Sequence, residues 1–212
     1  MKKIFGVGFI LVTSLVLAVF YSLSLSKRTA KVVRIVDGDT IEIDKSISPK
    51  GTVRLIGIDA PEKDECFYQD SINELTQLLL NKYVRFEQDT NTLDEYGRAL
   101  VYIFVDDLFV NEFLLEKGIA KFGLDRINKK YADRLVYAAE SGYKIKGGLW
   151  ISCAVSGVSC VIKGNLDVND KKFYHLPFFR HYASVVINFE HGDQWFCTEE
   201  EALRAGFTRA RE

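Results

Sequence analysis

The stretch TVRLIGIDAPE, residues 52–62, decides the fold of this chain. Its first half alternates apolar with polar or small residues, a pattern that predicts a β-strand over residues 52–58, and Pro61 ends it. Arg54 lies inside this strand, while Asp59 and Glu62 follow at its end. The stretch therefore predicts a strand that positions charged side chains at one edge of a sheet.

Two further polar clusters lie at the edges of predicted strands. DGDT at residues 37–40 is a turn signal between two strand-like runs, and DEYGR at residues 94–98 precedes the apolar run 99–105. Among the charged residues of these clusters and of residues 52–62, four carboxylates and two arginines are the candidate site residues: Asp37, Asp39, Asp59, Glu62, Arg54 and Arg98. Carboxylate oxygens suit hard cations such as Ca²⁺ or Mg²⁺, and arginines bind phosphate oxygens. A metal-dependent nuclease is therefore the leading hypothesis.

Each cluster also has an ordinary structural interpretation. Asp37-Gly38-Asp39, taken alone, is most often a plain turn. Arg54 in an apolar strand needs an anionic partner, which could be one of the same aspartates instead of a phosphate. Arg98 is equally ambiguous. The alternative function is a catalytically inactive OB-type nucleic-acid-binding module.

The order of the predicted elements indicates the fold class. Strands are expected over residues 31–36, 40–43, 52–58, 84–88, 99–105 and 108–110, and helices over residues 65–80, 111–116 and 131–141. Gly118 and Gly142 are expected to end the last two helices. The first five of these strands, with a helix inserted after the third, are typical of an OB-type β-barrel. The sequence thus predicts an α+β fold with about three helices over residues 31–152.

The chain changes in character after this region. Residues 152–157 are small and polar and are predicted to form a linker, and residues 163–212 form an aromatic-rich unit predicted to be a small αβ module. Thr198 and Glu201 are spaced as a capping box for a helix that Gly206 ends. Histidine and cysteine in this unit leave a metal site open as the alternative to a packed module with a disulfide.

The four cysteines are expected to form disulfides, because an even number in an exported chain indicates such a framework. Three pairings are possible among Cys66, Cys153, Cys160 and Cys197, and the sequence leaves all three open. A zinc knuckle is the weaker alternative, since no Cys-x-x-Cys pair is present.

Export is predicted from the N-terminal segment. Residues 4–25 are largely apolar, with lysines before them and Lys27-Arg28 after them, and a helix of this length reaches about 33 Å, enough to cross a bilayer. Residues 1–26 are therefore expected to be a signal peptide or an N-terminal membrane anchor. The rest would be membrane-anchored facing outside the cytoplasm, or secreted or periplasmic, and monomeric. Because the net charge is −1, polyanion binding requires a local patch or a bound cation.

In the order DGDT, RLIGIDAPE, YGRALVY and VNEFLLEKG, the motifs over about residues 32–150 resemble the staphylococcal nuclease (thermonuclease) family. The resemblance implies an OB barrel, a calcium (Ca²⁺) cofactor, and hydrolysis of DNA or RNA at the 5′ P–O bond, which leaves 3′-phosphates. It implies that Asp39 and Asp59 bind Ca²⁺ through their side chains and Ala60 through its main-chain carbonyl, with Asp37 in support.

The same resemblance implies the roles of the remaining site residues. Glu62 would act on the attacking water, and Arg54 and Arg98 would stabilise the charge that develops on phosphorus. Tyr96 could bind a terminal phosphate. Glu95 stands where the best-known member has lysine, which implies a difference in substrate affinity. The C-terminal unit resembles a SUNSET-type accessory module found after bacterial nuclease domains.

Overall fold

The computed structural model of the protein describes residues 28–153 and 160–211. The predicted signal peptide or anchor lies outside these residues, as does most of the predicted linker. Ser152, which was expected to begin the linker, instead closes a short helix, α5 (Leu149–Ser152). Within the two described ranges, no helix is long and apolar enough to span a membrane.

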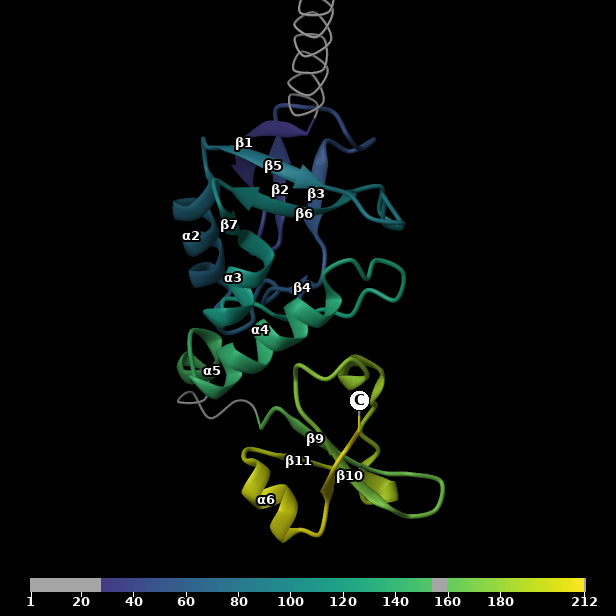
Figure 1. Cartoon of the computed structure of the whole chain (residues 1–212). Helices are drawn as coiled ribbons and strands as arrows, with labels where there is room; N and C mark the ends of the chain where they lie inside the picture. Colours follow the sequence, from purple (N-terminus) through teal and green to yellow (C-terminus); the bar gives the residue numbers. More distant parts are fainter. Residues whose placement is uncertain (1–27, 154–159, 212) are drawn as a thin grey trace, which may run out of the picture.

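Five strands form a closed barrel in the upper part of Figure 1. Their order is β3-β2-β1-β5-β6, and neighbours along it are antiparallel. A parallel pairing between β3 and β6 closes the barrel. The strands are β1 (Thr29–Ile35), β2 (Thr40–Ile43), β3 (Thr52–Leu55), β5 (Tyr83–Glu87) and β6 (Ala99–Val105), and β7 (Leu108–Phe109) adds to the edge of β6. The predicted α+β fold with an OB-type barrel is confirmed.

The strand predicted over residues 52–58 is interrupted. β3 ends at Leu55, Gly57 turns the chain with a φ of +78°, and Ile58–Asp59 forms a separate short strand, β4, paired with β8 (Lys121–Phe122). Asn111 holds the bend, because its buried amide donates to the Ile56 carbonyl oxygen (2.8 Å) and accepts from the Ile103 N–H (2.9 Å). The break places Asp59 outside the barrel strands, in β4, where it is exposed.

Helices cover the barrel on one side and at its lower end (Figure 1). α2 (Tyr68–Leu79) begins later than the predicted residue 65, because residues 62–65 form a turn in which the Glu65 N–H donates to the Glu62 carbonyl oxygen. α3 (Val110–Glu116) ends before Gly118, as predicted, and packs against α4 (Ala132–Lys144).

The expectation that Gly142 ends the third helix is wrong. Gly142 is buried inside α4, which continues to Lys144. A Cβ atom at this position would clash with the carbonyl oxygen of Leu115 in α3. The glycine is therefore explained by the close approach of two helices, a tertiary contact that helical spacing alone does not reveal.

The C-terminal part consists of β9 (Ile162–Leu166), β10 (Lys172–His175), η1 (Tyr182–Ser184), η2 (Phe189–His191), β11 (Gln194–Phe196), α6 (Glu199–Arg204) and β12 (Thr208–Arg209). Its strands form a second sheet in the order β11-β9-β10-β12. Thr198 and Glu201 form the predicted capping box of α6. Contacts to α4 include the packing of Tyr143 against Phe178, whose ring centroids lie 5.5 Å apart. The predicted boundaries of the two domains stay a prediction.

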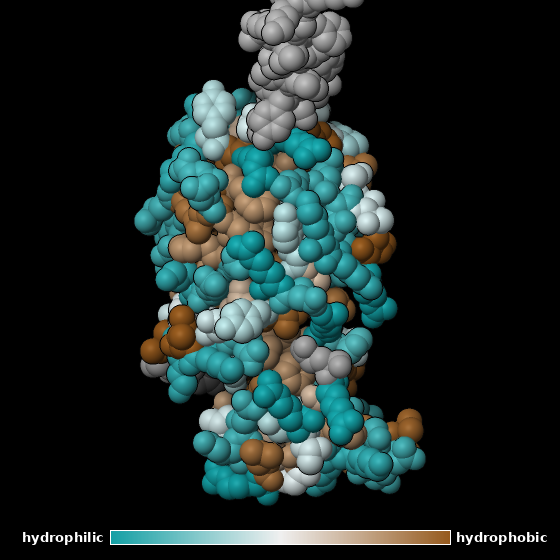
Figure 2. Space-filling view, in the orientation of Figure 1, coloured by the Kyte–Doolittle hydropathy of each residue, from teal (hydrophilic) through white to brown (hydrophobic). Residues whose placement is uncertain are grey.

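Two disulfides pair the cysteines as Cys66–Cys153 and Cys160–Cys197. The sequence predicted disulfides but left this pairing open. The first bond joins the segment before α2 to the end of α5, and the second lies within the C-terminal part. The surface seen in Figure 2 is largely hydrophilic, and its apolar side chains form small, separate patches.

Candidate active site

The turn Asp37-Gly38-Asp39 connects β1 and β2 and fixes the position of Asp39. The Asp39 N–H donates to Oδ1 of Asp37 at 3.0 Å. A Cβ atom at Gly38 would lie 2.5 Å from Oγ of Ser71 and 2.6 Å from Cβ of Ala60, so only glycine fits between the turn, α2 and the segment after β4. The DGD pattern is therefore a turn, and it is also a packing requirement of this site.

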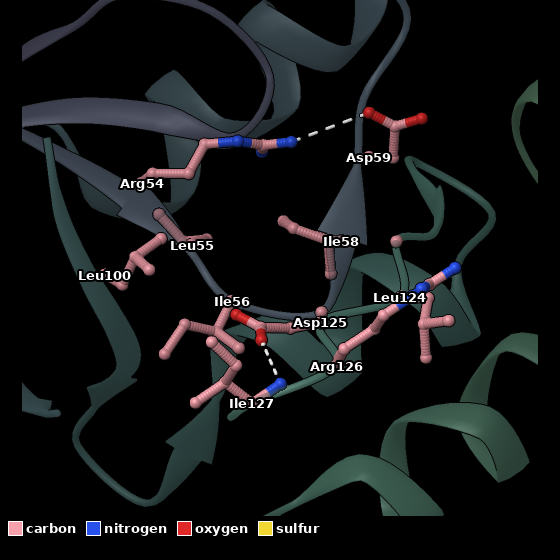
Figure 3. A pocket seen from close by; sticks show the side chains of 12 residues that line it. Arg54, Leu55, Ile56, Ile58, Asp59, Leu100, Leu124, Asp125, Arg126 and Ile127 are labelled. Carbon is pink, nitrogen blue, oxygen red and sulfur yellow. Dashed lines mark hydrogen bonds and ion pairs between the residues drawn. The ribbon is translucent and has the colours of Figure 1, made fainter. Parts of the chain in front are cut away.

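Asp39 is the centre of the cluster. Its Oδ2 accepts the Ala60 N–H at 2.9 Å and forms an ion pair with Nη1 of Arg54, and its Oδ1 accepts the Thr40 hydroxyl at 3.0 Å. Nη2 of Arg54 lies 3.5 Å from Oδ1 of Asp59, as the dashed line in Figure 3 marks. Both predicted metal-binding side chains thus converge on one guanidinium group, and the internal ion pair considered for Arg54 is present.

Burial raises the pKa of Asp39 to about 7, although the charge of Arg54 and the Ala60 N–H oppose this rise, and the neighbouring Asp37 adds to it. Only 5% of the Asp39 surface is exposed. A buried carboxylate beside a second carboxylate gains stability from additional positive charge. The ionised form of Asp39 is therefore disfavoured by burial and would be stabilised by further positive charge.

Arg98 reaches the same cluster through Thr40. Its Nη1 lies 3.3 Å from Oγ1 of Thr40, and its Nε donates to Oδ2 of Asp94 at 2.6 Å. Burial alone would raise the pKa of Asp94, but hydrogen bonds from Arg98 outweigh it and hold that pKa below the usual range. The predicted supporting residue Tyr96 is exposed, with its ring centroid 5.4 Å from the Arg98 guanidinium carbon.

Thr40 and Asp94 are site residues that the sequence reasoning did not single out. Both stand inside the quoted motifs, DGDT and DEYGR. Their neighbours were assigned roles because they are charged and lie at strand ends, whereas the part that Thr40 plays depends on a contact across 58 residues of sequence. Both residues are therefore visible in the sequence motifs, but their contacts become evident only in the structure.

Glu62 lies in the exposed segment that follows Ala60 and the buried Pro61. Its main-chain N–H donates to Oε2 of Glu65 at 3.0 Å. Within the described residues, its carboxylate has no hydrogen-bond or ion-pair partner. The structure places the segment beside Asp39 through Ala60, but it does not bring the Glu62 carboxylate into contact with the other predicted residues.

A pocket of about 400 Å³ opens beside Arg54 and Asp59. Figure 3 shows aliphatic side chains around it, together with the loop after β8 that carries Asp125, Arg126 and Ile127. Oδ1 of Asp125 accepts the Ile127 N–H at 2.8 Å, which shapes this loop. The sequence reasoning missed these three residues, because a short polar loop gives no signal of what it faces.

The donors at the site fit a hard cation. Asp39, Asp59 and the Ala60 carbonyl supply only oxygen, the ligand type of Ca²⁺ and Mg²⁺. Among residues 28–153 and 160–211, no group of three or more His, Cys, Asp or Glu side chains is arranged to hold a metal ion. A hard cation takes six or more oxygen ligands, so two carboxylates and a carbonyl would leave further positions to water or substrate.

An OB-type barrel that carries an aspartate–arginine cluster beside a pocket defines the class of OB-fold nucleases. The family model described as "Staphylococcal nuclease homologue" matches residues 52–152. The chain belongs to the staphylococcal nuclease family, and nucleic acid is the substrate that this family implies.

Individual relatives support the same family assignment. The chain is 33% identical over 131 residues to the thermonuclease of Staphylococcus hyicus, which covers 59% of this chain and 77% of that protein. It is 34% identical over 125 residues to the thermonuclease of Staphylococcus intermedius, covering 56% and 74%. A Haemophilus influenzae protein named "Uncharacterized endonuclease" is 34% identical over 145 residues, covering 66% and 78%. The predicted nuclease function is thus confirmed at the level of the family.

Proposed function

We propose that this protein is a Ca²⁺-dependent endonuclease that hydrolyses DNA, RNA or both and leaves 3′-phosphates. One observation carries the proposal: Asp39 and Asp59 converge on the Arg54 guanidinium group, and Thr40 links Arg98 to the same carboxylate. Two acidic ligands and two arginines thereby meet within one hydrogen-bonded cluster.

Asp39, Asp59 and the Ala60 carbonyl would hold the cation, which when bound supplies a Lewis acid for a phosphate oxygen. Asp37 supports this set, because its Oδ1 accepts the Asp39 N–H and fixes the turn. Burial of Asp39 supports the proposal, since an added positive charge would stabilise its ionised form.

Arg54 and Arg98 would bind the phosphate and stabilise the negative charge of the transition state. A guanidinium group offers five N–H donors, so Arg98 can keep its Nε bond to Asp94 and still donate from its other nitrogens. The same capacity lets Arg54 bind a phosphate oxygen while it remains beside Asp39 or Asp59. Removing one such donor typically costs about 100- to 1,000-fold in kcat.

Glu62 would orient or deprotonate the attacking water. Its exposed carboxylate has no partner within the described residues and follows closely after Ala60, which is bonded to Asp39. A carboxylate that is free of other contacts can accept a proton from water. Tyr96, exposed beside Arg98, would bind a terminal phosphate.

We propose further that the protein acts outside the cytoplasm, either anchored in the membrane or released. The two disulfides support this location, because such bonds persist in oxidising compartments. N-terminal sequencing of the mature protein would distinguish a cleaved signal peptide from an anchor.

A plasmid-nicking assay tests the proposed activity. The expected result is cleavage with Ca²⁺ and none with EGTA, with products that carry 3′-phosphates. Glu62→Gln should lower the rate by about 100-fold or more at unchanged melting temperature. Glu74→Gln, an exposed site on α2, is the matched control and should cleave normally. Nucleic-acid binding without cleavage in Ca²⁺ would instead support the inactive binding module.

A further inference from the structure

The Cys66–Cys153 disulfide restrains the segment that carries Glu62. Cys66 lies in the irregular segment between β4 and α2, and Cys153 follows α5. The Cα atoms of the two residues lie 5.7 Å apart, although 87 positions separate them in sequence. The bond therefore ties the segment of Glu62 to a distant helical end of the molecule.

The two ends of this segment are held by different contacts. At its start, the Ala60 N–H donates to Asp39, and Pro61 is buried. At its end, Ser71 in the first turn of α2 packs against Gly38 of the DGD turn. Between these contacts, the covalent bond at Cys66 joins the segment to the end of α5.

Two residues of this segment have a left-handed backbone conformation. Asp64 and Phe67 both have a φ of +73°, which aspartate tolerates better than other residues and which is unfavourable for a bulky side chain such as Phe67. Phe67 stands at the start of α2, where no side chain caps the helix. Unfavourable backbone conformations persist where the surroundings hold them, and they relax when a restraint is removed.

We propose that the Cys66–Cys153 disulfide positions Glu62 for catalysis and makes the nuclease dependent on oxidation of this pair. The inference rests on the proposed role of Glu62. Cys66 and Cys153 are positioning residues, because they act through the segment and do not contact the substrate. A displacement of about 1 Å at a reacting group can lower a rate about 100-fold.

Reduction of the Cys66–Cys153 bond would lower the nuclease activity. A dithiol such as dithiothreitol gives two electrons and two protons, which break the S–S bond and form two thiols, while the dithiol closes to its own cyclic disulfide. Cys66 is exposed whereas Cys153 is buried, so the attacking thiolate reaches the sulfur of Cys66 first. The enzyme would thus be active outside the cytoplasm and weakly active in a reducing compartment.

The second disulfide offers a matched control. Cys160–Cys197 joins residues of the C-terminal part, across 37 positions, and neither cysteine lies in the segment of Glu62. The comparison uses Cys66→Ser/Cys153→Ser and Cys160→Ser/Cys197→Ser. Each pair is prepared in the wild-type background and in Glu62→Gln.

Steady-state cleavage with Ca²⁺ gives kcat and KM for each variant. Loss of Cys66–Cys153 should lower kcat about 10- to 100-fold and change KM less than about twofold, whereas loss of Cys160–Cys197 should leave kcat within about twofold of wild type. In the Glu62→Gln background, loss of Cys66–Cys153 should cause no further decrease. An inactive wild type would count against the proposed function itself, separately from this inference.

Wild-type kcat in Cys66→Ser/Cys153→Ser would overturn the inference, and so would an equal loss in the Glu62→Gln background. If that variant does not fold, the full-length wild-type protein is titrated with dithiothreitol at a temperature where circular dichroism shows it folded. Activity should then fall with reduction of Cys66–Cys153 and return on reoxidation. Full activity of the folded, reduced enzyme contradicts the proposal.

Discussion

The main-chain N–H of Ala60 donates a hydrogen bond to Oδ2 of Asp39, 2.9 Å away, although 21 residues separate them. This bond couples the DGD turn to the segment that carries Glu62. The same carboxylate pairs with Arg54 and receives the Thr40 hydroxyl that lies beside Arg98. All three polar clusters of the sequence therefore meet at Asp39.

Asp39→Asn should strongly lower Ca²⁺-dependent cleavage and leave the fold intact. The amide oxygen can still accept the Ala60 N–H, but it carries no charge for a cation or for Arg54. Because burial already disfavours the charge on Asp39, a neutral side chain of the same size is tolerated. We expect a loss in kcat of about 100-fold or more and weaker Ca²⁺ binding in calorimetry.

The control for this substitution is Asp44→Asn, which removes a charge from a carboxylate that accepts the Lys31 N–H on another part of the barrel. It should bind Ca²⁺ and cleave like wild type. Wild-type Ca²⁺ affinity in Asp39→Asn would show that this aspartate is not a ligand.

Thr40→Val should lower activity without a large loss of stability. The substitution keeps the shape of the side chain and removes the hydroxyl that bridges Arg98 and Asp39. Each of the two hydrogen bonds that are lost contributes about 1 kcal/mol to the folding free energy. Because the Arg98 side chain loses its hydrogen bond to Thr40 and keeps the one to Asp94, we expect kcat to fall about tenfold in the nicking assay.

Thr52→Val, on the neighbouring strand β3, is a matched control. Oγ1 of Thr52 is buried and has no hydrogen-bond partner within the described residues. Its removal should leave activity unchanged and leave stability unchanged or slightly higher. If both valine variants lost activity equally, the bridge through Thr40 would not explain the effect.

The ionised Glu87 carboxylate should stabilise the fold near neutral pH, and this stabilisation should be lost in acid. Burial alone would raise the pKa of Glu87, but hydrogen bonds from Lys130, Tyr131 and Arg85 outweigh it and hold the pKa below its ordinary value of 4.5. A lowered carboxyl pKa contributes stability above the unfolded-state pKa, and this contribution is lost as the pH falls through the folded-state pKa. Melting temperatures of wild type and Glu87→Gln, measured from pH 7 to pH 3, should therefore converge below about pH 4.5. A constant difference across this range would contradict the assignment.

The parts of the fold that depend on local patterns could be predicted. The run 99–105 is buried along its whole length, as a strand between a barrel interior and covering helices requires. The capping box of α6 is equally local. The break after Leu55 could not be predicted, because the Asn111 amide holds the bend from a helix 55 positions later in the sequence.

The candidate site divides in the same way. Charged residues in the motifs were identified because their chemistry is evident from the side chain, and the structure joins Asp37, Asp39, Asp59, Arg54 and Arg98 in one cluster. The pairing of the cysteines and the pocket lining at residues 125–127 were not predictable. The cysteine pairing and the pocket lining depend on contacts between segments that are distant in sequence, and these contacts form only in the folded protein.

Gly142→Ala decides between the two interpretations of this glycine. Alanine is favoured over glycine inside a helix by about 1 kcal/mol, so an unhindered site would be stabilised. A Cβ atom here would instead clash with the Leu115 carbonyl oxygen, a backbone atom that cannot turn aside. Overpacking of this kind costs about 1–3 kcal/mol, and we expect a net loss of stability in urea unfolding. Ser141→Ala, at the preceding position of α4, should be neutral or slightly stabilising. A more stable Gly142→Ala variant would show that α3 and α4 can separate without cost, and that the glycine is not required for their contact.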